Sequence, residues 1–115
     1  MNWIPLKMIE ELDLIQQKSF TNPQVIFKHS TRCSISSISS MALGRLEREE
    51  SPLNIDFYFL DLIAFRNISN AVSEKFQVPH QSPQILVIKN GICIFDESHN
   101  SIFMDEIREE ALKTV

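Results

Sequence analysis

The sequence predicts an α/β domain with a four-stranded mixed sheet flanked by helices and an extra helix at the N-terminal end. Three observations support this fold class. Helical and strand patterns alternate over the first two thirds of the chain, a hairpin signal follows, and an amphipathic segment comes last. The length of 115 residues fits a single domain over residues 1–115, large enough to bury one core.

The first half of the chain shows a helix, a strand and a second helix. Apolar residues at three-residue steps predict a helix over residues 6–18, which stops before Pro23. The segment Gln24–His29 is apolar through Phe27, as expected for a strand covered on both faces. Helical spacing after Cys33 predicts the next helix, through Ile35, Ile38, Ala42 and Leu46.

The second half contains three more strands and two more helices. Residues 56–63 are rich in aromatic and branched side chains and predict a strand, and residues 66–76 have helical spacing. This alternation implies two parallel strands joined by a right-handed crossover. Residues 84–89 and 92–95 flank Asn90-Gly91, the commonest hairpin turn. The last helix carries Ile102, Phe103, Ile107 and Ala111.

Composition and charge exclude several classes of partner. The net charge is −4 and Lys and Arg form no cluster, which argues against a nucleic-acid partner. The N-terminus has no signal-peptide pattern, and no apolar run approaches the ~20 residues that span a bilayer, so we expect a cytoplasmic protein without a membrane partner. There, two cysteines far apart in sequence are expected to be free, reactive or buried.

Cys33 lies where the predicted strand passes into a helix. Unpaired amides and the helix dipole at such a position stabilise a thiolate, and reactive cysteines there titrate at about 3.5 to 7.5 instead of about 8.5. Arg32 would add to this effect if its guanidinium turns toward the sulfur. A small buried hydrophobe is the alternative interpretation. Cys33 alone leaves both open.

Several motifs together resemble a known family. They comprise Lys28-His29-Ser30-Thr31-Arg32-Cys33-Ser34-Ile35-Ser36, Arg66, Ser69-Asn70, His80-Gln81-Ser82-Pro83-Gln84, Asn90-Gly91 and Ser98-His99. In this order and spacing, over about residues 24–102, they resemble the monothiol bacilliredoxin family of thioredoxin-like proteins. The predicted order of elements is likewise the thioredoxin layout with one more N-terminal helix.

The resemblance implies a thiol–disulfide oxidoreductase acting under oxidative stress. Its expected substrates are client proteins in mixed disulfide with bacillithiol, a low-molecular-weight thiol that replaces glutathione in many Gram-positive bacteria. Cys33 would attack the disulfide and become bacillithiolated, and bacillithiol or a partner reductase would regenerate it. Bacillithiol is thus a co-substrate, and no cofactor is expected. Thr31, Arg32, Ser34 and Ser36 would form the thiolate environment.

The other cysteine is not expected to take part. Ser36 stands where a dithiol thioredoxin has its second cysteine, and it could bond to the thiolate or cap backbone amides. Cys93 would begin a strand at the far end of the sheet, on the order of 20 Å from Cys33. A disulfide needs Cα atoms within roughly 7 Å, so we expect Cys93 to be a core or edge-strand residue.

The resemblance also implies a substrate loop formed by His80, Ser82 and Pro83, with a cis Ser82–Pro83 bond beside the active cysteine. Without the resemblance a trans bond is expected, because only about 5% of X-Pro bonds are cis, and Pro83 would merely open a strand. Bacillithiol carries a malate, so its carboxylates need cations or donors. The candidates are Lys28, His29, Arg32, Arg66 and His80, each with a solvated or packing role as the alternative.

The sequence departs from the pattern of thioredoxin-like proteins at two positions and leaves two alternative functions open. Ser34 replaces the proline usual in the family, and Phe27 stands where dithiol thioredoxins bury an acid. Cys33 could instead be the modified residue of a non-catalytic redox sensor or binding protein. An iron–sulfur carrier ranks lowest, because its Cys-Gly-Phe-Ser signature is absent. No metal site is expected, since no further ligands join His29 and Cys33.

Overall fold

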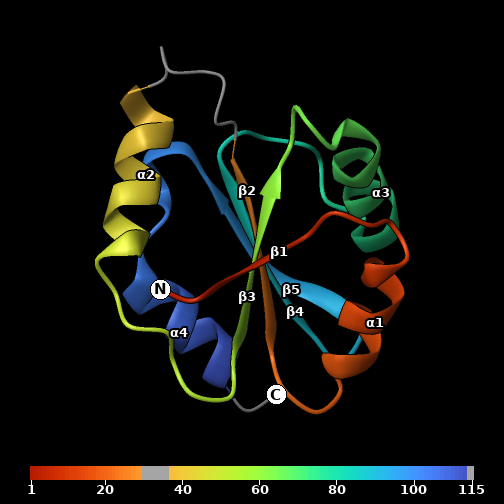
Figure 1. Cartoon of the computed structure of the whole chain (residues 1–115). Coiled ribbons are helices and arrows are strands. Elements are labelled where there is room, and N and C mark those ends of the chain that lie inside the picture. Colours follow the sequence, from red (N-terminus) through yellow and green to blue (C-terminus); the bar gives the residue numbers. More distant parts are fainter. Residues whose placement is uncertain (30–36, 114–115) are drawn as a thin grey trace.

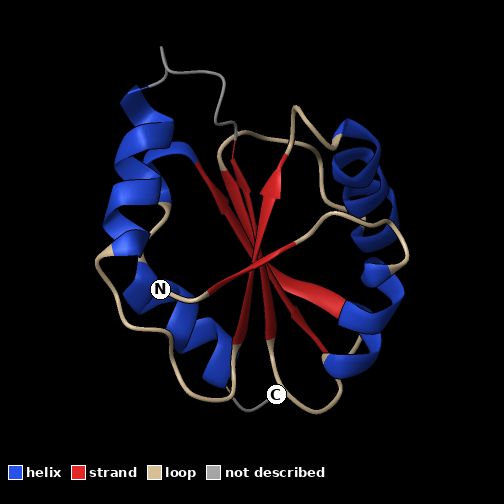
Figure 2. Ribbon diagram, in the orientation of Figure 1, coloured by secondary structure: helices blue, strands red, loops and turns tan. Residues whose placement is uncertain are grey.

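The computed structural model describes residues 1–29 and 37–113 and shows a five-stranded mixed sheet between two pairs of helices (Figures 1 and 2). The strands are β1 (Trp3–Pro5), β2 (Gln24–His29), β3 (Asp56–Asp61), β4 (Gln84–Lys89) and β5 (Ile92–Ser98). The helices are α1 (Glu11–Lys18), α2 (Ser37–Glu47), α3 (Arg66–Phe76), the 3₁₀ turn η1 (His99–Ser101) and α4 (Met104–Leu112). The order across the sheet is β1-β3-β2-β4-β5.

The pairing of the strands explains the mixed sheet. β1 and β2 lie parallel to β3 on either side of it, whereas β4 is antiparallel to both β2 and β5. The predicted parallel pair and hairpin are therefore confirmed. β2 is central and buried at all six positions, which agrees with a strand covered on both faces.

The prediction of four strands is wrong by one, because β1 adds an edge strand. Trp3 pairs with Phe57, and the Leu6 N–H continues this pairing by donating to the Phe59 carbonyl at 2.9 Å. Leu6 is buried, so its apolar character reflects the core and not a helix. The first helix accordingly begins at Glu11 and not at Leu6.

Three other boundaries differ from the prediction. β3 ends at Asp61, two residues early, because the Asp61 Oδ1 accepts the N–H groups of Ile63 and Ala64 at 3.2 Å each and starts a turn. β5 continues to Ser98 instead of residue 95. The last helix begins at Met104, after η1.

Each face of the sheet is covered by two helices. Figure 1 shows α1 and α3 on one side and α2 and α4 on the other. The core under α1 and α3 includes Leu12, Ile15, Ile26, Leu60, Ile68, Val72, Leu86 and Ile88. The core under α2 and α4 includes Val25, Phe27, Ala42, Leu46, Phe57, Ile85, Val87 and Ile107. Alternate residues of β2 and β4 thus enter opposite cores.

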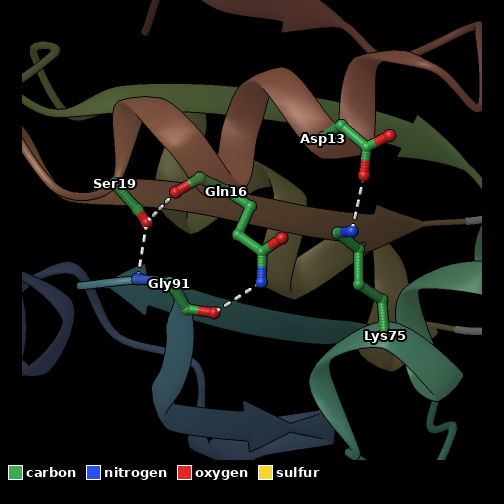
Figure 3. Close-up of polar contacts among 5 residues, drawn as sticks. All are labelled: Asp13, Gln16, Ser19, Lys75 and Gly91. Carbon is green, nitrogen blue, oxygen red and sulfur yellow. Dashed lines mark hydrogen bonds and ion pairs between the residues drawn. The ribbon is translucent and has the colours of Figure 1, made fainter.

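Polar contacts attach α1 to the β4–β5 hairpin and to α3 (Figure 3). The Ser19 Oγ accepts the Gly91 N–H at 2.8 Å, and the Gln16 side-chain amide donates to the Gly91 carbonyl at 2.9 Å. Gly91 has φ +83°, a conformation that glycine adopts without strain. Lys75 on α3 forms an ion pair with Asp13 at 2.6 Å. Within the described part of the chain, no helix is long and apolar enough to cross a membrane.

Candidate functional site

The expected nucleophile Cys33 and its neighbours Thr31, Arg32, Ser34 and Ser36 lie outside the described residues. The chain that the structure describes before them is the carboxyl end of β2, and the chain after them is α2. The first half of α3 and the segment before β4 contact the end of β2. These three elements hold the other predicted site residues.

The segment before β4 contains the predicted substrate loop. The Ser82–Pro83 peptide bond is cis, as the family resemblance implies, and Pro83 is buried. The buried side chain of Gln84 holds this segment from inside: its amide donates to the Pro79 carbonyl at 3.0 Å, and its oxygen accepts the Gln81 N–H at 3.3 Å. His80 lies between these two contacts and is exposed.

Lys28 is fully buried beneath this loop. Its Nζ donates to the Ser69 carbonyl at 3.3 Å and to the Ser73 Oγ at 3.2 Å, and it lies 3.4 Å from the His80 Nδ1. Desolvation of the ammonium lowers the pKa of Lys28 to about 8. Lys28 therefore cannot contact a ligand directly, and among the described residues His80 is the exposed side chain that lies against it.

His80 and Arg66 form the exposed part of the site, and the positive charge there belongs to Arg66. The His80 Nδ1 also lies 3.5 Å from the Ser69 Oγ. Partial desolvation and the nearby charges of Lys28 and Arg66 lower the pKa of His80, so its ring is neutral near pH 7. Arg66 is the first residue of α3 and is exposed.

His29 lies on the opposite face of the sheet from Lys28. Its ring stacks on Phe27 at 5.7 Å and meets Phe59 edge-on at 5.8 Å. It is 5% exposed, and its Nδ1 has no hydrogen-bond partner among the residues that the structure describes. Burial lowers the pKa of His29, and the negative charge of Asp61 partly opposes this shift. The structure thus separates His29 from His80 and Arg66.

Cys93 lies on the edge strand β5 and packs against the core under α1 and α3, as predicted. Its half-buried thiol donates to the Phe95 carbonyl at 3.3 Å. Burial raises the pKa of Cys93 to about 11, so the sulfur is protonated at neutral pH and is a poor nucleophile. Among the described residues, no group of three His, Cys, Asp or Glu side chains could hold a metal ion.

Comparison with known proteins places the chain in a family. The family model for monothiol bacilliredoxin BrxC matches residues 4–107. The chain belongs to the monothiol bacilliredoxin family. This membership, together with the fold, supports a thiol redox function.

Solved structures show that the fold is that of thioredoxin. A candidate oxidoreductase with a thioredoxin fold superposes with a TM-score of 0.78 at 23% identity, covering 93% of this chain and 91% of that chain. Thioredoxin from Malassezia sympodialis gives 0.64 at 11% identity, covering 93% and 85%. Thioredoxin from Schistosoma mansoni gives 0.61 at 20% identity, covering 99% and 96%.

The role of two serines in the site was not predicted from the sequence. Ser69 was noted only as part of the Ser69-Asn70 motif, without a role, and Ser73 was not noted at all, yet both contact Lys28. A signal was present, because Arg66, Ser69 and Ser73 recur at i, i+3 and i+7 and so form a polar stripe along α3. That stripe faces the end of β2, where a buried lysine needs acceptors.

Proposed function

We propose that this protein removes bacillithiol from protein mixed disulfides by monothiol exchange at Cys33. The family match over residues 4–107 carries this proposal, because it includes Cys33 and the loop ending in Pro83. Cys93 does not compete as the nucleophile, since burial raises its pKa to about 11. The proposed setting is the cytoplasm, where free thiols are kept reduced.

The reaction needs one protein thiol. The Cys33 thiolate attacks the bacillithiol sulfur of the mixed disulfide, the original S–S bond breaks, and the client cysteine leaves as a thiolate that takes a proton from solvent. A new disulfide then joins Cys33 to bacillithiol. A second bacillithiol molecule or a partner reductase attacks this disulfide and releases Cys33 for the next turnover.

The described residues supply a binding surface for the anionic part of bacillithiol. Arg66 and His80 are exposed at one end of the face covered by α1 and α3, and the buried charge of Lys28 lies directly behind His80. A guanidinium and an imidazole N–H both suit carboxylates. We assign the malate carboxylates to this surface.

A mass-spectrometric transfer assay tests the proposal. A purified client protein carrying bacillithiol on one cysteine is mixed with wild type, Cys33→Ser or Cys93→Ser. Wild type and Cys93→Ser should free the client thiol and gain one bacillithiol adduct on Cys33. Cys33→Ser should do neither.

Three outcomes would contradict the proposal. Equal client release by Cys33→Ser would exclude Cys33 as nucleophile, and an adduct on Cys33 without turnover when excess bacillithiol is present would favour a redox sensor. Absence of bacillithiol from extracts of the source organism would exclude this thiol as the physiological substrate.

A further inference from the structure

We propose that Lys28 is a positioning residue that holds His80 as a neutral ring protonated on Nε2, so that the loop before Pro83 presents an N–H donor to the carboxylate of the thiol substrate. This inference rests on the proposed function for its ligand. The state of the ring, however, is assigned from contacts among described residues alone.

The hydrogen-bond pattern around His80 determines the tautomer. A lysine ammonium has three donors and no acceptor, so the His80 Nδ1, 3.4 Å from the Lys28 Nζ, must be the acceptor. The Ser69 hydroxyl, 3.5 Å from the same nitrogen, can also donate to it. With Nδ1 occupied as an acceptor, the single ring proton of neutral His80 lies on Nε2.

Lys28 cannot easily move to accommodate the other tautomer. Its side chain is fully buried, and its remaining donors are engaged by the Ser69 carbonyl and the Ser73 Oγ. Turning the ammonium away would leave a buried charge without a partner, which is costly. The lysine is therefore a fixed donor beneath the ring.

The surrounding charges also keep His80 neutral. Among the described residues, the charged groups that act on the ring are Lys28 on β2 and Arg66 on α3, and both are cations. A second ring proton, on Nδ1, would make the ring an imidazolium and place a third positive charge directly against the Lys28 ammonium. His80 therefore offers its Nε2–H over the whole neutral pH range, and anion binding there does not depend on its titration.

Nitrogen-15 NMR of the histidine rings tests the assignment, with His80→Gln used to identify the His80 signals. In wild type, we expect the Nε2–H tautomer and a pKa below the ordinary value of about 6.5. In Lys28→Met, which keeps the side-chain length without a donor or charge, the pKa should rise and the Nδ1–H tautomer should appear. Lys75→Met is the charge-matched control on α3, because Lys75 pairs with Asp13 instead, and it should leave His80 unchanged.

Kinetics with the bacillithiolated client link the ring state to binding. At pH 7, where the Lys28 ammonium still predominates, Lys28→Met should raise KM about 2- to 10-fold with little change in kcat, the effect of one weakened hydrogen bond. Near pH 5.5 the variant ring becomes an imidazolium with both nitrogens protonated, so the KM difference should disappear. A purely structural role for Lys28 would give a KM change independent of pH.

Two results would overturn the proposal: an Nδ1–H tautomer or a pKa at or above 6.5 in wild type, or an unaltered His80 ring in Lys28→Met. The wild-type spectrum alone can overturn the proposal, so the proposal remains testable even if Lys28→Met fails to fold. The expected spectra without any release of bacillithiol would refute the proposed function while leaving the effect of Lys28 on the ring established.

Discussion

Lys28 and His29 are adjacent basic residues in the sequence, but they belong to different parts of the molecule. Successive side chains of a strand point to opposite faces, so Lys28 enters the side of α3 and His29 the aromatic cluster with Phe27 and Phe59. Of the five candidate ligands for carboxylates, the described residues bring only Arg66 and His80 to a common surface, with Lys28 behind them.

The deprotonation of Lys28 should make the free energy of unfolding of the protein depend on pH. Its pKa is about 8 in the folded state and about 10.4 in the unfolded state, so between these values the unfolded chain binds more protons and stability rises with pH. Below pH 8 both states are charged and this contribution is constant. The free energy of unfolding of wild type minus that of Lys28→Met should therefore increase from pH 8 to 10, by at most about 1.4 kcal/mol per pH unit.

Urea unfolding of both proteins in reducing buffer at pH 7, 8, 9 and 10 measures this difference. Subtracting the variant cancels the titration of groups that the two proteins share, including Tyr58, whose pKa burial raises to about 12. A difference that stays flat or falls with pH would show that the ammonium of Lys28 is not desolvated.

Cys93 should react slowly with alkylating reagents. In Cys33→Ser it is the one remaining thiol. With a pKa of about 11, its thiolate fraction at pH 8 is about 100-fold or more below that of an ordinary cysteine. The iodoacetamide rate should accordingly titrate far above pH 8.5 in the folded protein and near 8.5 in denaturant. A folded-state midpoint near 8.5 would contradict the assigned burial.

At the scale of elements, the attachment of α1 to the hairpin should be worth more than the ion pair to α3. Ser19→Ala leaves the buried Gly91 N–H without its acceptor, so we expect a loss of about 1–3 kcal/mol in the free energy of unfolding. Asp13→Asn removes a pair whose carboxylate is 77% exposed, and such pairs contribute below about 1 kcal/mol.

Chemical denaturation of the two variants gives this comparison, since Asp13 lies in α1 and Ser19 directly follows its last residue (Figure 3). Asp13 is an exposed helix position and Ser19 lies beyond the last helical residue, so we expect changes in helix propensity to be small beside the predicted gap. Equal losses, or a larger loss in Asp13→Asn, would show that the surface pair and not the buried serine attaches α1.

Elements with repeated patterns were predictable from the sequence, and those without were not. The strands at 24–29 and 84–89 and the helix at 66–76 have the predicted bounds, because continuous apolar runs and an i, i+3, i+7 spacing extend over whole elements. β1 has three residues, one of them Pro5, which is too short for any period to be visible. β1 is a strand because it pairs with β3, and the two paired segments lie more than fifty residues apart in the sequence.

The site was likewise predictable only in part. The cis Ser82–Pro83 bond followed from the family resemblance, since nothing local in the sequence favours it. The contact between Lys28 and His80 joins residues 52 positions apart, so no sequence pattern could reveal it. Only the tertiary structure shows that the lysine is buried and that the histidine above it is exposed.

At the scale of the whole molecule, β1 connects the edge of the sheet to the core under α2 and α4. Trp3 stacks on Phe27 at 5.5 Å, and its Nε1–H donates to the Glu47 Oε1 at 3.0 Å, so one side chain joins β1, β2 and α2. Trp3 is the single tryptophan of the chain. Its fluorescence therefore reports specifically whether β1 is attached to the rest of the sheet.

If β1 belongs to the same cooperative unit as the rest of the sheet, tryptophan fluorescence and far-ultraviolet circular dichroism should follow one unfolding transition in urea with equal midpoints. We expect this coincidence because Trp3 packs on Phe27, a fully buried residue of the central strand. Glu47→Gln should keep the two midpoints together, since an exposed hydrogen bond contributes little. A fluorescence transition at lower urea than the dichroism transition would instead show that β1 detaches first, leaving a four-stranded sheet as the cooperative core.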